Sequence, residues 1–456
     1  MIGIADRDTR RLPWRERRVR EWIAALPMAE PLRALGLLAQ SVRALNSSVI
    51  DPATRVALLG YYEEPAMSLA VVLRKPQADG VGKTLVATLH SEIAQGYQMA
   101  LTPQMRPEAR QQAVLGILRQ LGEVVRGAYR SYIPVPPGLW RRIHTLFRET
   151  ESVTESVEVA YVRILLLGLA DPYALPADGI EAVHRIILET GHRAVLNNAV
   201  GFAITAEADK PADPTGAEGT LFLDTEPLVA EIARLRAALR THKVLPPNLA
   251  SMLLPGLADR LFASLIETWR PGPRRKSLRI RLGGERLLCQ GLVALQKLIL
   301  EDFGHHRYVD LDEVSNQHIP GVLTAPELPT GSSRVTTWTV RDAGRSGLWL
   351  SAHDLAGPPP VPGTWIGVKD PHRGGRWRAA VVRWLKRSRP HEYAIGIEVL
   401  GETQTATILS AIPAAASFVQ APRAGTPIRW QGPPQRPVNV PGEASRVHAV
   451  TEAPAR

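Results

Sequence analysis

The stretch at residues 337–350, TWTVRDAGRSGLWL, constrains the fold of this chain more than any other. It begins with β-branched residues and a tryptophan, which favour an extended strand. Residues 342–347, DAGRSG, then interrupt the strand with small and polar residues that favour a turn, and extended sequence resumes at residue 348. The sequence therefore predicts two consecutive strands, with a carboxylate, Asp342, and accessible backbone N–H groups at the turn between them.

The first 270 residues show a different periodicity. Apolar residues recur there at helical spacing, and prolines mark the short turns between successive segments. This pattern is typical of stacked helical hairpins, although no strict repeat period is visible. We therefore predict an α-helical domain over residues 1–270, TPR-like or an irregular solenoid, with a small β-hairpin near residues 199–224.

A proline- and arginine-rich run at residues 270–275, RPGPRR, favours a linker, so we place the domain boundary there. Beyond it, alternating segments predict an antiparallel six-stranded β-barrel over residues 271–411, with a helical insertion near residues 283–333. Residues 412–456 are rich in Pro, Ala and Arg and predict a disordered tail. The expected fold class is therefore α+β multidomain. The six expected strands lie at residues 280–282, 335–341, 347–351, 365–369, 377–385 and 392–399.

The spacing Asp342-x-Gly344-x-x-Gly347 resembles the Asp/Asn-x-Ser-x-x-Gly motif of PilZ domains, the bacterial receptors for cyclic di-GMP. The upstream Arg-x-x-x-Arg motif of that family is similar to RKSLR, which runs from Arg275 to Arg279. The resemblance implies that these five residues bind cyclic di-GMP. Arginine forks would hold phosphate and guanine, and Asp342 would accept N–H groups of the guanine edge. Gly344 stands where the family has Ser, so one hydroxyl contact is missing.

Each part of this interpretation has an alternative. Arg275 and Arg279 are also explained by an arginine-rich linker, and Asp342 with Gly344 by an ordinary hairpin turn. A PilZ-like barrel that binds no nucleotide would serve as an interaction scaffold, as some PilZ domains do. The helical half resembles the long N-terminal regions attached to some proteobacterial PilZ domains, through short matches such as residues 164–173, ILLLGLADPY.

The charge is unevenly distributed along the chain. The whole chain carries a formal net charge of +11, and residues 271–456 hold 24 Lys and Arg against 15 Asp and Glu. A basic C-terminal part indicates an anionic partner such as a nucleotide. An arginine-rich, solvated surface without such a partner is the alternative. RNA binding is a weaker third interpretation, because interleaved aromatic stacking motifs are missing.

Several protein classes are not expected. The single cysteine, Cys289, excludes a disulfide framework and a cysteine-based metal site, and favours a reducing, cytoplasmic setting. The N-terminus lacks an apolar signal segment, and the longest apolar runs are too short to cross a bilayer. The histidines are scattered, and no nucleophile elbow or glycine-rich cofactor fingerprint is present, so we expect no enzyme, no metal and no cofactor.

Together these observations predict a cytoplasmic receptor or effector for cyclic di-GMP. A helical scaffold would bind an unidentified protein partner, and a PilZ-like barrel would bind the nucleotide. No membrane association is expected, and nucleic acid is not the expected partner.

Overall fold

The computed structural model describes residues 14–73, 80–151, 153–214, 221–242, 244–250, 255–272, 279–302, 335–344, 347–355, 357–372, 375–389 and 391–400. Arg275, most of the expected insertion and the expected C-terminal tail lie outside these residues. The described part is mostly helical before residue 273 and mostly β-stranded after residue 279, which confirms the α+β class.

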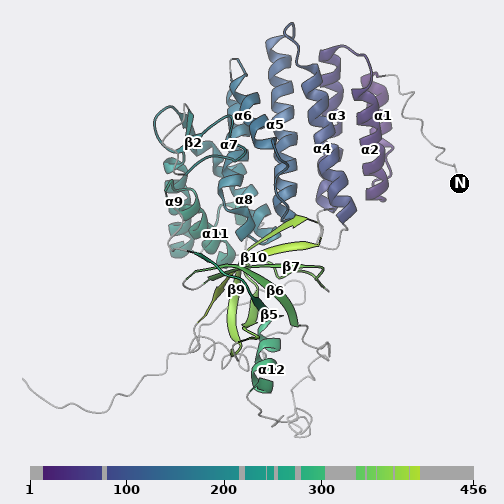
Figure 1. Cartoon of the computed structure of the whole chain (residues 1–456). Coiled ribbons are helices and arrows are strands. Elements are labelled where there is room, and N and C mark those ends of the chain that lie inside the picture. Colours follow the sequence, from purple (N-terminus) through teal and green to yellow (C-terminus); the bar gives the residue numbers. More distant parts are fainter. Residues whose placement is uncertain are drawn as a thin grey trace, which may run out of the picture. The chain divides into compact units, whose positions relative to one another are not determined.

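Successive helices before residue 273 are what the helical spacing of apolar residues predicts (Figure 1). Asp51 precedes α3, and its carboxylate accepts the Thr54 backbone N–H at 2.9 Å, the arrangement expected of an N-cap. The helices are α1 (Glu16–Ala24), α2 (Pro31–Asn46), α3 (Pro52–Leu73), α4 (Gly80–Ala100), α5 (Pro107–Arg130), α6 (Leu139–Arg148), α7 (Glu155–Leu169), α8 (Ala177–Thr190), α9 (Glu226–His242), α10 (Pro247–Ala250) and α11 (Pro255–Thr268), with 3-10 turns η2 (Pro172–Ala174) and η3 (Gly191–Arg193).

One continuous apolar core runs through this helical part, from Val19 on α1 to Trp269 after α11. Helix α3 has 22 residues, and an 18-residue stretch of it has a mean hydropathy of 1.3, so by length and composition it could cross a membrane. Its buried residues Leu59 and Tyr62 belong to this core, and the helix contacts α1, α2 and α4. Buried residues make up 44% of that stretch, and Met67, Val71 and Val72 on the same helix are exposed.

His144 on α6 shows how the core accommodates polar side chains. One ring nitrogen is 2.7 Å from the Tyr161 hydroxyl and the other is 2.8 Å from the Lys210 carbonyl oxygen. Burial lowers the pKa of His144 below its usual value. His144 is therefore a packed core residue whose two ring nitrogens both have hydrogen-bond partners.

The hairpin expected near residues 199–224 is part of a three-stranded antiparallel sheet. Strands β2 (Phe202–Ile204) and β3 (Leu221–Asp224) pair as expected, and β1 (Val195–Asn197) adds to the other edge of β3. Gly201 has φ of 122°, and a Cβ atom there would lie 2.1 Å from the Leu223 carbonyl oxygen. Only glycine allows this close approach of β2 to β3.

A closed antiparallel ring of six strands forms the barrel, in the order β6-β5-β8-β9-β10-β7 with β7 pairing back onto β6. A seventh, two-residue strand, β4 (Ile280–Arg281), pairs with β6 outside the ring. The ring strands are β5 (Glu285–Gln290), β6 (Val335–Ala343), β7 (Gly347–His353), β8 (Trp365–Lys369), β9 (Arg378–Arg389) and β10 (Glu392–Val399).

The structure differs from the sequence prediction in the segment that supplies the sixth ring strand. The prediction used residues 280–282, whereas the ring uses β5, which falls inside the range assigned to the insertion. Leu288 and Cys289 on β5 are both buried, because Leu288 faces the barrel core and Cys289 faces helix α12 (Leu292–Asp302). Two-sided burial removes the alternating pattern by which a strand is recognised.

The described residues of the helical part and of the barrel belong to one compact unit. Tyr132, which follows α5 and has φ of 56°, packs into the barrel core with residues such as Leu385. Its carbonyl oxygen accepts the Arg387 backbone N–H at 2.7 Å, and the Lys386 ammonium lies 4.6 Å from the centre of the Tyr173 ring. The division into domains at residue 270 stays a prediction, which limited proteolysis can test.

Candidate ligand-binding site

A β-bulge on β6 determines which way Asp342 faces. Trp338 and Val340 point into the barrel core, so strict alternation would place Asp342 there as well. The pairing of β6 with β7 instead shifts between Val340, opposite Leu350, and Asp342, opposite Trp349. Directly paired residues share a face of the sheet, so Asp342 lies beside the half-exposed Trp349 on the outer wall.

Arg279 reaches Asp342 from the segment just before β4. Its Nη1 donates to Asp342 Oδ1 at 2.6 Å, a charge-assisted hydrogen bond. The Asp342 side chain is 16% exposed and that of Arg279 is 37% exposed. Arg281, two residues further on, is paired with Asp342 across β4 and β6. One guanidinium group, that of Arg279, therefore approaches a carboxylate that is still partly open to solvent.

The two glycines of the motif lie at the turn that joins β6 to β7. The Gly344 backbone N–H donates to the Gly347 carbonyl oxygen at 2.8 Å, which closes the turn. A Cβ atom at Gly347 would lie 3.0 Å from the Ile397 carbonyl oxygen of β10, so a side chain there would press against the neighbouring strand. The structure therefore brings Arg279, Asp342, Gly344 and Gly347 together.

Two tryptophans that were not predicted as site residues lie on the neighbouring strands, in a row that runs across β7, β10 and β9. Trp349 on β7 is paired with Gly396 on β10, and Gly396 is paired in turn with Trp384 on β9. The two indole rings meet edge to face, with centroids 6.2 Å apart. A Cβ atom at Gly396 would lie 1.9 Å from Trp384 Nε1, so the glycine makes room for the indole. The sequence signal for this row was a glycine in mid-strand.

Charged groups flank this row. Arg383 on β9 donates to the Glu398 carboxylate at 2.7 Å, and Arg341 donates to the Ser351 hydroxyl at 2.7 Å. The outer face therefore combines a carboxylate able to accept N–H donors, guanidinium groups of the kind that suit phosphate, and indole rings on which a flat base can stack. Within the described ranges, no group of three His, Cys, Asp or Glu side chains could hold a metal ion.

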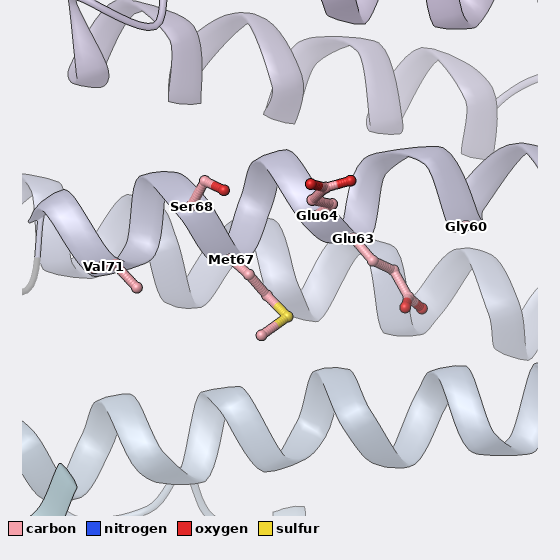
Figure 2. Close-up of a pocket in the computed structure, with 6 residues that line it drawn as sticks. All are labelled: Gly60, Glu63, Glu64, Met67, Ser68 and Val71. Carbon is pink, nitrogen blue, oxygen red and sulfur yellow. The ribbon is translucent and has the colours of Figure 1, made fainter. Parts of the chain in front are cut away.

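A separate cavity of about 470 Å³ lies on α3 (Figure 2). Its lining residues all belong to that helix and include Glu63, Met67 and Val71. Glu63 accepts a hydrogen bond from the Tyr97 hydroxyl at 2.8 Å, so its carboxylate is already engaged. This open, largely apolar hollow lacks the combination of charge and aromatic faces found on the barrel.

Comparison with known proteins places a related sequence over most of the chain. Residues 17–199 match the family model described as the N-terminal domain of the cyclic-di-GMP receptor FimW. The cyclic-di-GMP receptor FimW of Pseudomonas aeruginosa is 23% identical over 484 residues, which covers 84% of this chain and 76% of the relative. The expected resemblance to a cyclic di-GMP receptor with a helical N-terminal region is confirmed. The matches do not test the PilZ identity of the barrel, which stays a prediction.

Proposed function

We propose that this chain is a receptor for cyclic di-GMP and that the nucleotide binds to the outer barrel face around Asp342. The observation that carries the proposal is the Arg279–Asp342 pair, placed by the bulge on β6 beside Trp349. The likeness to FimW, a cyclic-di-GMP receptor by name, supports the same ligand.

The geometry suits a guanine base with an attached phosphate. Arg279 uses one oxygen of Asp342, which leaves the second oxygen to accept N–H groups from a guanine edge. The guanidinium of Arg279 retains further donors for a phosphate oxygen. The exposed face of Trp349 offers a stacking surface, and such a contact contributes about 1–3 kcal/mol per base.

The helical half has the role of a protein-binding scaffold in this proposal. Binding of nucleotide at the barrel would affect the helical half through Tyr132. The side chain of Tyr132 belongs to the barrel core, and its carbonyl oxygen accepts a backbone hydrogen bond from β9. β9 also carries Trp384 of the outer row, so one strand joins the ligand face to the helical contact. The chain would act in the cytoplasm as a non-enzymatic effector.

A second candidate function is a scaffold that binds no nucleotide. Two observations favour it: Gly344 replaces the serine of the PilZ motif, and Asp342 is already neutralised by Arg279. Loss of one hydroxyl contact costs about 0.5–1.5 kcal/mol, which weakens a site without removing it. Receptor function therefore remains the better account.

Calorimetric titration with cyclic di-GMP tests the choice between the two functions. The wild-type protein should bind cyclic di-GMP, and Asp342→Ala should abolish or strongly weaken that binding. Asp370→Ala is the matched control, because Asp370 is a similarly buried carboxylate paired with Arg286 at 3.0 Å between other strands of the barrel. Absence of binding heat in the wild-type protein, or equal effects of both substitutions, would favour the scaffold.

A further inference from the structure

Two cavities on the helical half share one wall, the exposed side of α6. One has a volume of about 530 Å³ and is lined by α4, α5 and α6, and the other has about 300 Å³ and extends to residues 206–207. Arg141, Thr145 and Glu149 line both of them. Because the two cavities share these three residues, we treat them as one groove that extends to both sides of α6, and we call it the α6 groove.

The amphipathic pattern of α6 explains why arginines line the groove. Trp140, Ile143 and Phe147 are buried in the helical core. Arg141, Thr145 and Arg148 recur at helical spacing on another face, which the core does not cover. Arg141 and Arg148 are separated by about 10 Å along the helix axis, at 1.5 Å per residue, which is the span of about three residues of extended chain.

The guanidinium groups of the groove differ in their engagement. Arg142 donates to Gln98 at 3.0 and 3.2 Å, and Arg110 donates to the Thr102 carbonyl oxygen at 3.2 Å. Arg148 lies 3.5 Å from Glu207. Arg141 is exposed and, within the described part of the chain, makes no ion pair and no side-chain hydrogen bond. It is the side chain most ready to accept an anionic group.

The composition of the groove distinguishes among anionic partners. Glu149 and Glu207 lie among the arginines and would repel the uniform negative charge of a nucleic acid. Leu101, Val114 and Leu146 add apolar side chains to the larger cavity, where they suit leucine-like side chains of a peptide. The charge pattern thus fits a chain that carries separated carboxylates between apolar residues.

We propose that the α6 groove binds an acidic segment of a partner protein, with carboxylates at Arg141 and Arg148 and apolar side chains between them. This inference rests on the proposed role of the helical half as a protein-binding scaffold, but not on nucleotide binding by the barrel. It assigns the partner-binding surface to α6 and the neighbouring ends of α4 and α5.

The test uses the full chain and fluorescein-labelled peptides in which Asp or Glu alternates with Leu, compared with peptides in which Lys replaces the acidic residues. Fluorescence anisotropy should show binding of the acidic peptides alone. Arg141→Glu should weaken that binding by about tenfold or more, because an attractive contact becomes repulsive. Arg18→Glu on α1 is the matched control, since it reverses the charge of another exposed arginine of the helical half and should leave peptide affinity nearly unchanged.

Three results would overturn the inference: no binding of any acidic peptide, equal losses in the two variants, or competitive displacement of the peptide by cyclic di-GMP. Equal losses would mean a general effect of charge, and competition would assign the groove to the nucleotide. Calorimetry with cyclic di-GMP on the same two variants separates this test from that of the receptor function. Both variants should retain wild-type nucleotide binding if the nucleotide site is on the barrel.

Discussion

The helical half and the barrel reach their structures by different routes. In the helical half, a single apolar core runs from Val19 to Trp269, and each helix contributes through residues spaced along its own sequence. In the barrel, the candidate site is formed across strands: Asp342, Trp349, Gly396 and Trp384 come from four different strands that are adjacent only through their pairing. The structure of the helical half thus follows from the periodicity of each segment, whereas the candidate site of the barrel depends on the register between strands.

The two regions also differ in how substitutions at exposed residues should affect them. Exposed charges of the helical half, such as Arg141, lie outside its core and can change without disturbing it. On the barrel, outer residues also support one another, as Trp384 does by covering Gly396. We therefore expect changes at the barrel face to affect ligand binding first, and changes in the helical core to affect stability first.

After Asp342→Ala, the substitution Arg279→Ala should have the largest effect on binding of cyclic di-GMP. The substitution removes a charge-assisted contact and should weaken binding by about 1.5–3 kcal/mol. Affinity should also fall with added salt, because exposed phosphate contacts are screened. Calorimetry measures both effects. Arg286→Ala, which removes an arginine from the Asp370 pair instead, should leave affinity near the wild-type value. Equal losses in the two variants would contradict the assignment of the site.

Gly396→Ala tests whether the tryptophan row belongs to the site. The new Cβ atom would lie 1.9 Å from Trp384 Nε1, so the indole must move and disturb its edge-to-face contact with Trp349. We expect nucleotide affinity to fall by about 1–3 kcal/mol, the value of one stacking contact. Gly283→Ala is the control, because a Cβ atom there meets no other atom within 4 Å. Unchanged affinity in Gly396→Ala would remove the tryptophans from the site.

The pH dependence of stability tests the contribution of the buried His144 to the helical half. Burial lowers its pKa below 6.5, so the folded state binds a proton less tightly than the unfolded state. The free energy of unfolding of the helical half should therefore decrease as pH falls below about 6.5. His144→Gln should reduce this dependence in denaturant unfolding. An unchanged pH dependence in His144→Gln would contradict this explanation.

Gly344→Ser should have the smallest effect and the opposite sign. It restores the hydroxyl of the PilZ motif and should leave nucleotide affinity unchanged or improve it by up to about tenfold. Gly347→Ser should instead weaken binding, because its Cβ atom would lie 3.0 Å from the Ile397 carbonyl oxygen. A competition titration against labelled cyclic di-GMP compares the two. Loss of binding in both variants would mean that the turn tolerates no side chain at either position.

Sequence reasoning succeeded where structure is local. Apolar residues at helical spacing predicted the helical part, and on α6 the residues Trp140, Ile143 and Phe147 form the buried face. Alternation also predicted most of the ring strands, because one face of each is covered by the barrel core. These signals lie within single segments and need no knowledge of neighbours.

It failed where structure depends on pairing. Strand β5 was missed because Leu288 and Cys289 are buried on opposite faces. The tryptophan row could not be found, because residues 349, 384 and 396 meet only through the register of three strands. The orientation of Asp342 depends on a bulge, which a regular two-residue period cannot anticipate.

Hydrogen–deuterium exchange of the full chain, with and without cyclic di-GMP, tests the central claim most directly. If the nucleotide binds the outer barrel face, saturating ligand should slow exchange in peptides that cover β4, β6, β7 and the β6–β7 turn. Peptides from α6 should show no comparable direct protection. Protection confined to the helical half, or an exchange pattern unchanged by the nucleotide, would contradict the assignment of ligand binding to the barrel.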